Sequence, residues 1–145
     1  MKKLLLTSAL FIALISTSFA AGTEALSFNG ANAFKKSFPG ATNISVKNMD
    51  ELTKISFTSN NENYEVFYSD NGDMVAQSKH IKLEALPKNT LATLQQKYAD
   101  WATTEAIEFV NESDGATLYY VSIQKDGKRM IFEATSDGAT RIYKK

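Results

Sequence analysis

The chain has 145 residues, with 16 basic and 16 acidic side chains, one histidine and no cysteine, so its formal charge at neutral pH is zero. Without cysteine it can carry neither a disulfide framework nor a lipidated-cysteine anchor, and it cannot use a cysteine nucleophile. The balanced charge, with no stripe of lysine and arginine, argues against nucleic acid as a partner, because phosphate binding needs clustered cations.

Residues 1–20 have the features of a secretion signal. Lys2 and Lys3 precede an apolar run from residue 4 to residue 15, and small residues around Ala20 follow it. We expect cleavage after Ala20, a periplasmic or secreted protein, and no stable membrane insertion after cleavage. The apolar run is short for a bilayer-spanning helix, and an uncleaved anchor is the alternative. Removal of the signal leaves 14 basic and 16 acidic side chains.

Residues 21–82 are predicted to form a first unit, in which one helix precedes four antiparallel strands. Asn29 is the expected N-cap of a helix over about residues 30–38, and the pair Pro39 and Gly40 ends it. Alternating apolar and polar residues then predict four strands, separated by turn residues such as Asn60–Asn61 and Asn71–Gly72. These strands cover residues 43–49, 51–59, 63–69 and 73–79.

Residues 83–145 repeat the pattern and predict a second unit. The apolar spacing of Ala31, Phe34 and Phe38 recurs sixty positions later as Leu91, Leu94 and Tyr98, after a proline suited to a first helical turn. Strands are expected over residues 104–111, 116–125, 128–134 and 139–143, with Asp–Gly turns at 114–115, 126–127 and 137–138. The predicted fold class is therefore α+β: a tandem repeat of one helix followed by a four-stranded antiparallel sheet, with the helices packed on one sheet face.

Strand alternation also predicts which face each side chain takes. The residues expected to point at the helices are Ile55, Phe57, Tyr64, Val66, Ile107, Phe109, Val121, Ile123, Met130 and Phe132. The opposite face would carry Glu65, Phe67, Leu118, Tyr120, Arg129, Ile131 and Glu133. Aromatic, aliphatic and arginine side chains are typical of recognition surfaces, so Phe67, Tyr120, Arg129 and Ile131 are the candidate partner-binding residues. The alternative is that they form ordinary cross-strand pairs, or that the other unit covers them.

Several of these segments resemble the PepSY-like family of exported bacterial proteins: Leu86–Pro87, Tyr98, the strand over 119–123 and the turn at 136–138. Residues 38–41, 64–66 and 70–72 echo them in the first unit. This family is similar in shape to the beta-lactamase inhibitory protein, a tandem repeat whose concave sheet face grips its target. The resemblance implies a binding protein that inhibits or regulates a protein or peptide of the cell envelope, such as a peptidase. It supplies no catalytic residues, and the inhibitor's cysteines have no counterpart in this chain.

The titratable residues form no recognisable catalytic or metal-binding motif. His80 is the single histidine, and no Gly-x-Ser-x-Gly nucleophile elbow is present. The segment that starts at Asp70 is similar to part of a calcium loop, but Ile81 stands where such a loop needs a glutamate. We expect no enzyme activity, no metal site and no cofactor. Three carboxylates near the end of one strand are predicted to be solvated: Glu105, Glu108 and Glu112.

Three alternatives stay open at this point. A small-ligand carrier or envelope sensor would need an apolar pocket between helix and sheet, which bulky side chains are expected to fill: Phe34, Phe38, Phe57, Leu94 and Phe132. Trp101 is expected either to fill a junction between helix and sheet or between the units, or to contact a partner. Edge strands leave dimerisation open.

Overall fold

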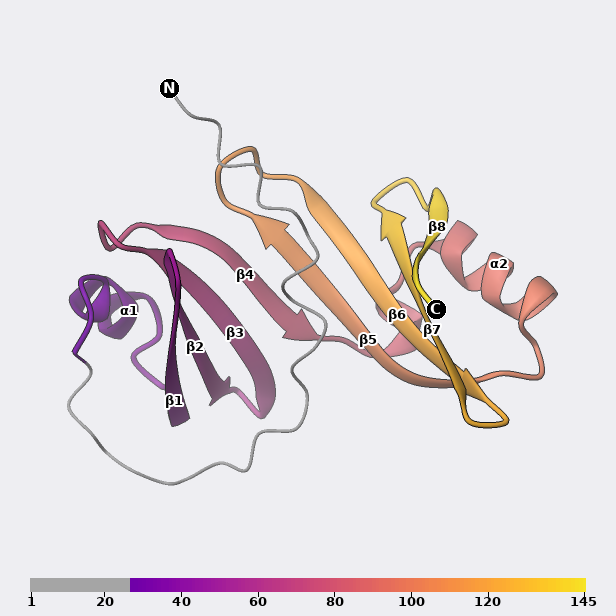
Figure 1. Ribbon diagram of the computed structural model, residues 1–145, viewed down its shortest axis with the longest axis horizontal. Helices are drawn as coiled ribbons and strands as arrows, with labels where there is room; N and C mark the ends of the chain where they lie inside the picture. The colour runs from indigo at the N-terminus through magenta and orange to yellow at the C-terminus, as the bar shows by residue number, and fades with distance from the viewer. Residues whose placement is uncertain (1–26) are drawn as a thin grey trace.

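The computed structural model describes residues 27–145, so the predicted secretion signal and its cleavage site lie outside the described residues. The described chain forms one antiparallel sheet of eight strands with two short α-helices (Figure 1). Within residues 27–145, no helix is long and apolar enough to cross a membrane. The elements are α1 (Ala31–Ser37), β1 (Thr42–Met49), β2 (Leu52–Ser59), β3 (Glu62–Ser69), β4 (Met74–His80), η2 (Leu83–Ala85), α2 (Lys88–Lys97), β5 (Ala102–Asn111), β6 (Thr117–Lys125), β7 (Lys128–Thr135) and β8 (Thr140–Lys144).

The continuity of the sheet shows that the predicted fold class, a tandem of a helix and a separate four-stranded sheet, is wrong. β4 and β5 pair in antiparallel fashion, from Ala76 opposite Asn111 to His80 opposite Ile107. Two separate sheets would each leave an edge strand with unpaired backbone N–H and C=O groups. Pairing β4 with β5 satisfies those groups and joins everything into a single sheet. The predicted boundary between residues 82 and 83 falls immediately before η2 and stays a prediction.

The strands follow one another across the sheet in chain order, and short turns connect all neighbours except β4 and β5, which η2 and α2 separate. Asn60 and Asn61 have φ values of 51° and 63° between β2 and β3, and Asp126 and Gly127 have 49° and 74° between β6 and β7. Two successive residues with positive φ are typical of the type I′ turn, whose twist matches that of the strands it joins. The turns predicted at both places are confirmed.

An asparagine ties the start of each α-helix to a distant turn of the sheet. The side-chain amide of Asn29 donates a hydrogen bond to the carbonyl of Asp70, and that of Asn89 donates to the carbonyl of Asp137 at 3.0 Å. The predicted N-cap role of Asn29 is wrong, because the cap position of α1 is Gly30 and no side chain caps the helix. The asparagine side chain instead fastens the helix to the β3–β4 turn.

The β7–β8 turn is expected to tolerate no side chain at Gly138. Gly138 has a φ of 87°, and a Cβ added there would lie 2.5 Å from the Cβ of Asn89. We expect Gly138→Ala to lower the free energy of unfolding by about 2 kcal/mol, through left-handed backbone strain and displacement of the α2 start. Gly115→Ala is the matched control: its φ is 68° but nothing lies within 4 Å of the added Cβ, so strain alone should cost about 1 kcal/mol. Equal losses in urea unfolding would contradict the close approach to Asn89.

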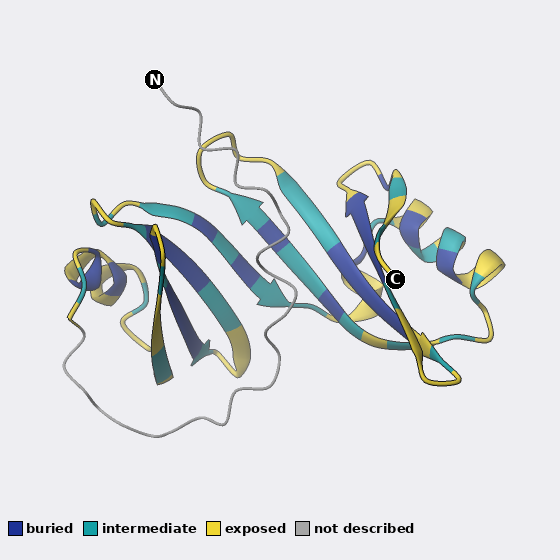
Figure 2. Ribbon diagram, in the orientation of Figure 1, coloured by how far each residue is buried: buried dark blue, intermediate teal, exposed yellow. Residues whose placement is uncertain are grey.

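Both α-helices cover the same face of the sheet. Phe34 of α1 packs in one cluster with Ile55, Phe57, Val66 and Tyr68. Leu94 of α2 packs in another cluster, with Leu86, Ala106, Val121, Ile123 and Phe132. The register places both clusters on one side, since Val66 lies opposite Gln77, Gln77 opposite Val110, and Val110 shares its side of β5 with Ala106. Buried segments accordingly run through the middle of β2, β3, β6 and β7 (Figure 2).

The predicted faces are correct for most strands and wrong for β5. Ile55, Phe57, Tyr64, Val66, Val121, Ile123, Met130 and Phe132 all lie in or against the helix-side clusters. Ile107 and Phe109 lie on the opposite face, and Ala106 is the residue of β5 that reaches the helix-side core. A register shift between Thr103 and Glu105 inserts an extra residue early in β5. Such bulges change which residues pair, and strand alternation alone does not reveal them.

Candidate functional site

The candidate site is the sheet face opposite the two helices, which we call the helix-free face. Its centre is an apolar cluster of Phe67, Ala76, Phe109, Tyr120 and Ile131, with Val75, Ile107, Leu118 and Tyr143 packed against it. Every described member of this cluster belongs to a strand from β3 to β8. The cluster therefore crosses the β4–β5 pairing and joins residues from both sides of that pairing in one surface.

The four candidate partner-binding residues lie on this face, in two different environments. Phe67, Tyr120 and Ile131 belong to the central cluster and are only 1%, 3% and 5% exposed. The Arg129 side chain is 52% exposed. The structure thus brings three of them together as a packed base, while Arg129 reaches solvent beside it. Their role in partner binding stays a prediction.

A buried ion pair borders the cluster on the side of β2 and β3. Lys54 Nζ lies 2.7 Å from Glu65 Oε1, and the Ser56 hydroxyl donates to the same oxygen at 3.3 Å. The Lys54 side chain is 3% exposed. Removing a charge from water is costly unless a partner compensates it. Each of these two side chains therefore needs the other, and the pair holds a fixed position beside the cluster.

A second polar group lies around the Glu105 carboxylate, on β4 to β7. His80 Nδ1 is 3.5 Å from Glu105 Oε1, and Arg129 Nη2 is 3.6 Å from Oε2. Arg129 Nε also donates to the Ser122 hydroxyl at 2.6 Å. Burial raises the pKa of the Glu105 carboxyl above its usual range, the charge of Glu65 adds to this, and His80 and Arg129 oppose it. The prediction that Glu105 is solvated is wrong, because the bulge in β5 turns it onto the helix-free face.

Glu105→Gln is expected to make the protein more stable at neutral pH and to leave stability nearly unchanged in acid. A raised pKa means that the folded state binds the proton more tightly than the unfolded state. The wild type therefore loses stability as pH rises from the ordinary carboxyl pKa through the raised one. Glutamine resembles the protonated carboxyl and removes this loss. Thermal unfolding between pH 4 and 7 measures it, with exposed Glu84→Gln as the control, and a pH-independent difference would contradict the burial of Glu105.

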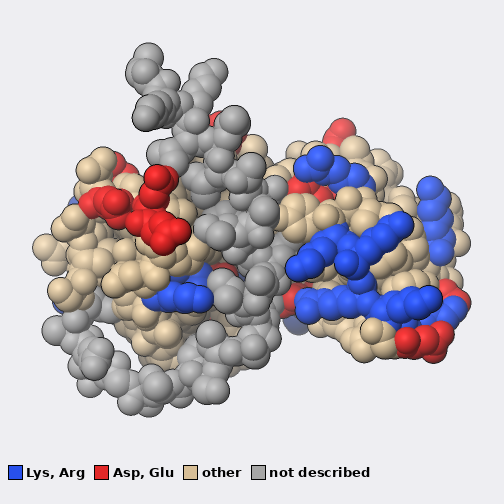
Figure 3. Space-filling view, viewed as in Figure 1, with Lys and Arg blue, Asp and Glu red and all other residues tan. Residues whose placement is uncertain are grey.

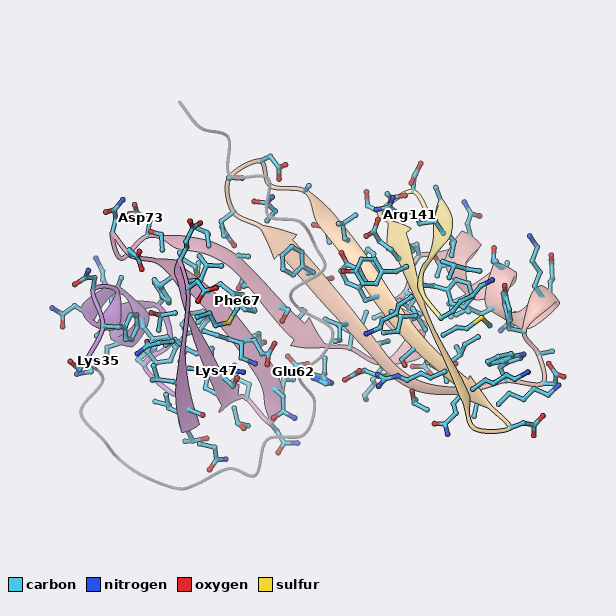
Figure 4. All side chains as sticks on the ribbon, viewed as in Figure 1. Lys35, Lys47, Glu62, Phe67, Asp73 and Arg141 are labelled. Atoms are coloured by element: carbon cyan, nitrogen blue, oxygen red, sulfur yellow. The ribbon has the colours of Figure 1, made fainter. Side chains whose placement is uncertain are left out.

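The third polar group joins β6, β7 and β8 through Glu133. Tyr120 donates its hydroxyl to Glu133 Oε2 at 3.1 Å. Arg141 approaches the other oxygen, Oε1, with Nε at 2.7 Å and Nη2 at 2.6 Å. The Glu133 side chain is 7% exposed and that of Arg141 is 70% exposed. One buried carboxylate, that of Glu133, thus binds both a central tyrosine and a solvent-facing arginine. Figure 4 labels Arg141 and, on the other half of the sheet, Phe67.

The helix side of the sheet carries a hollow of about 110 Å³, lined by Tyr64, Gln77, Ser78, Lys79, Glu108 and Val110. Lys79 Nζ lies 3.4 Å from Glu108 Oε1, and this carboxylate raises the pKa of the ammonium. Tyr64 donates its hydroxyl to Glu62 at 2.8 Å, a bond that raises the pKa of the phenol. Its lining residues therefore already pair with one another or with neighbours.

Residues 27–145 contain no group of three or more histidine, aspartate or glutamate side chains placed to bind a metal ion. His80 has Glu105 as its acidic neighbour. The acidic segment from Asp70 forms the β3–β4 turn, in which the Gly72 amide donates to the Ser69 carbonyl at 2.9 Å. Trp101 packs against the α2 cluster, with its ring 6.1 Å from that of Tyr98, so it lies at a junction of helix and sheet.

Solved structures share this arrangement of strands and helices over most of their length. A BLIP-like protein from Bacteroides fragilis has a TM-score of 0.67 at 17% identity, covering 85% of this chain and 92% of that chain. The fold is BLIP-like. A DUF2874 family protein from Bacteroides uniformis has a TM-score of 0.70 at 13% identity, covering 81% of this chain and 89% of its own. A predicted periplasmic protein from Bacteroides eggerthii has a TM-score of 0.73 at 12% identity, with coverages of 83% and 91%.

No family model matches the chain, and no curated protein matches it either. The PepSY-like resemblance therefore stays a prediction, while the BLIP-like fold rests on the structural neighbours.

Proposed function

We propose that this chain is an exported, non-enzymatic binding protein that recognises a protein or peptide of the cell envelope through its helix-free face. The observation that carries this is the composition of that face: a base of phenylalanine, tyrosine and isoleucine, with solvent-reaching arginines beside it. Aromatic and arginine side chains are the residues that dominate protein interfaces. An inhibitory or regulatory action on the partner is part of the proposal.

The dimensions of the sheet suit a protein partner. Eight strands at a spacing of about 4.8 Å give a width of roughly 34 Å. Strands of 8 residues, such as β2, β3 and β7, are about 26 Å long. The face therefore has a projected area of roughly 900 Å², similar in extent to the ~800 Å² that one partner contributes to a standard interface.

The small-ligand alternative receives less support from the structure. The space between α1 and the sheet is filled by aromatic rings, with the Phe34 centroid 5.0 Å from that of Phe57 and the Phe38 centroid 4.7 Å from it. The 110 Å³ hollow is well below the ~300–1,000 Å³ of typical small-molecule sites. Both observations favour a surface that binds macromolecules.

Site-specific photo-crosslinking tests the proposed binding face. Phe67→Ala and Tyr120→Ala would be poor probes, because both side chains are buried and their loss would destabilise the fold as well as alter the face. A photoreactive phenylalanine at half-buried Leu118 reports on the helix-free face, and one at exposed Gln95 of α2 is the matched control on the other side. We expect crosslinks to a defined envelope protein from position 118 only, competed by unlabelled protein. Equal labelling from both positions, or none from either, would sink the assignment.

A further inference from the structure

The C-terminal end of the chain carries a net positive charge, whereas the rest of the sequence is net negative. Residues 128–145 contain five basic side chains, Lys128, Arg129, Arg141, Lys144 and Lys145, and two acidic ones, Glu133 and Asp137. The whole sequence is neutral. Figure 3 shows lysine and arginine side chains gathered on the half of the molecule that contains β5 to β8. A surface of this kind attracts negatively charged partners and speeds their approach.

Two arginines of this area are held in place on the helix-free face. Arg129 is fixed through Nε on the Ser122 hydroxyl, and Arg141 through Nε and Nη2 on Glu133 Oε1. Arg129 Nη2 also lies 3.6 Å from Glu105 Oε2, and the two arginine side chains remain 52% and 70% exposed. A guanidinium carries five N–H donors, so each arginine keeps outward donors after these bonds. Because their planes are already fixed, little side-chain entropy is lost when they bind a carboxylate.

The register sets the spacing between the two arginines. Arg129 and Ile131 alternate along β7 on the helix-free face, and Arg141 lies directly opposite Glu133, the next residue of β7 on that face. Arg129 and Arg141 are therefore separated by four residue positions along the strands, a distance of about 13 Å. Ile131 and the apolar cluster lie midway.

We propose that the helix-free face binds an extended acidic segment of its partner, with the pattern acidic–x–apolar–x–acidic, over β7 and β8. Residues i, i+2 and i+4 of an extended segment lie on one side at the same ~13 Å spacing. Its two carboxylates bind Arg129 and Arg141, and its middle side chain lies against the cluster around Ile131. This inference rests on the proposed function and specifies the chemistry of the partner.

Titration with short labelled peptides tests the pattern. The probe is fluorescein-Ser-Glu-Thr-Leu-Thr-Glu-Ser, and the controls replace both glutamates with lysine or move the second glutamate one position, onto the other side. We expect the probe to bind at least about tenfold more tightly than either control, and we expect its affinity to fall at 0.5 M salt. Equal binding of the lysine peptide would overturn the proposal.

Arginine variants locate the binding. Arg129→Gln with Arg141→Gln should weaken the probe by at least about tenfold, whereas Lys88→Gln with Lys97→Gln on α2 changes the charge equally and should not. Loss of the Arg141 charge would leave the Glu133 carboxylate with one partner fewer, so Arg141→Lys is a second variant that keeps this charge. It removes the planar guanidinium donors and should weaken binding several-fold in a folded protein. Unchanged binding in a folded Arg129→Gln variant would contradict the proposal.

The crosslinking experiment distinguishes the two levels of inference. If position 118 still captures the same partner when both arginines are replaced, the acidic segment is wrong and the binding face stands. If position 118 captures nothing and the peptides do not bind, both fail.

Discussion

Replacing Glu65 with leucine is expected to destabilise the protein by about 3 kcal/mol or more, because it leaves the Lys54 ammonium buried without a carboxylate. Lys54 Nζ lies 2.7 Å from Glu65 Oε1, and the lysine side chain is almost wholly removed from water. The same change removes the acceptor of the Ser56 hydroxyl. Urea unfolding measures the loss.

The two partners should contribute unequally to a double-mutant cycle. Lys54→Met should cost less than Glu65→Leu, since the Glu65 side chain keeps 19% exposure and still accepts from Ser56. Combining both changes should restore much of the lost stability, because apolar groups of similar size can replace a buried ion pair at little cost. A double variant as unstable as Glu65→Leu alone would show that the buried charge is not the cause.

Phe34→Ala is expected to cost about 3 to 5 kcal/mol, the range for removing a buried aromatic side chain. Phe34 is 1% exposed, and its ring lies 5.4 Å from that of Phe38 and 5.0 Å from that of Phe57. A helix of seven residues is too short to be stable alone, so α1 depends on this packing.

The loss of Phe34 should therefore also release the helix. We expect amide hydrogen exchange to rise across α1 in Phe34→Ala while β6 and β7 stay protected. Lys35→Ala is the control on the same helix, since Lys35 is exposed, and it should change stability by less than about 0.5 kcal/mol. A loss below about 1 kcal/mol for Phe34→Ala would mean that α1 contributes little to the fold.

The positions of the strands follow from local sequence, whereas the joining of the sheet does not. Alternation between turn residues predicted strands at 116–125 and 128–134, and the structure has Thr117–Lys125 and Lys128–Thr135. The pairing of β4 with β5 brings Ala76 opposite Asn111, across η2 and α2. Alternation states which side chains share a face, but it carries no information on which distant edge a strand will pair with.

The candidate site was predictable to the same extent. Phe67, Tyr120 and Ile131 were placed on one face by alternation alone, and the structure gathers them in one cluster. Lys54 was missed. Ser56 lies directly opposite Glu65, so Lys54, two residues along β2, is the diagonal neighbour of Glu65, and long side chains can meet across that diagonal. Arg141 was missed because its place opposite Glu133 depends on how β8 pairs with β7, which alternation along one strand does not give.

The β4–β5 pairing also sets the order in which the sheet can assemble. Its partners are 27 residues apart at His80 and Ile107 and 35 apart at Ala76 and Asn111, whereas tight turns link the other neighbouring strands. Closing a longer loop costs more chain entropy, and non-local pairing slows folding. We therefore expect β1 to β4 and β5 to β8 to collapse first as independent meanders, with their union as the late step.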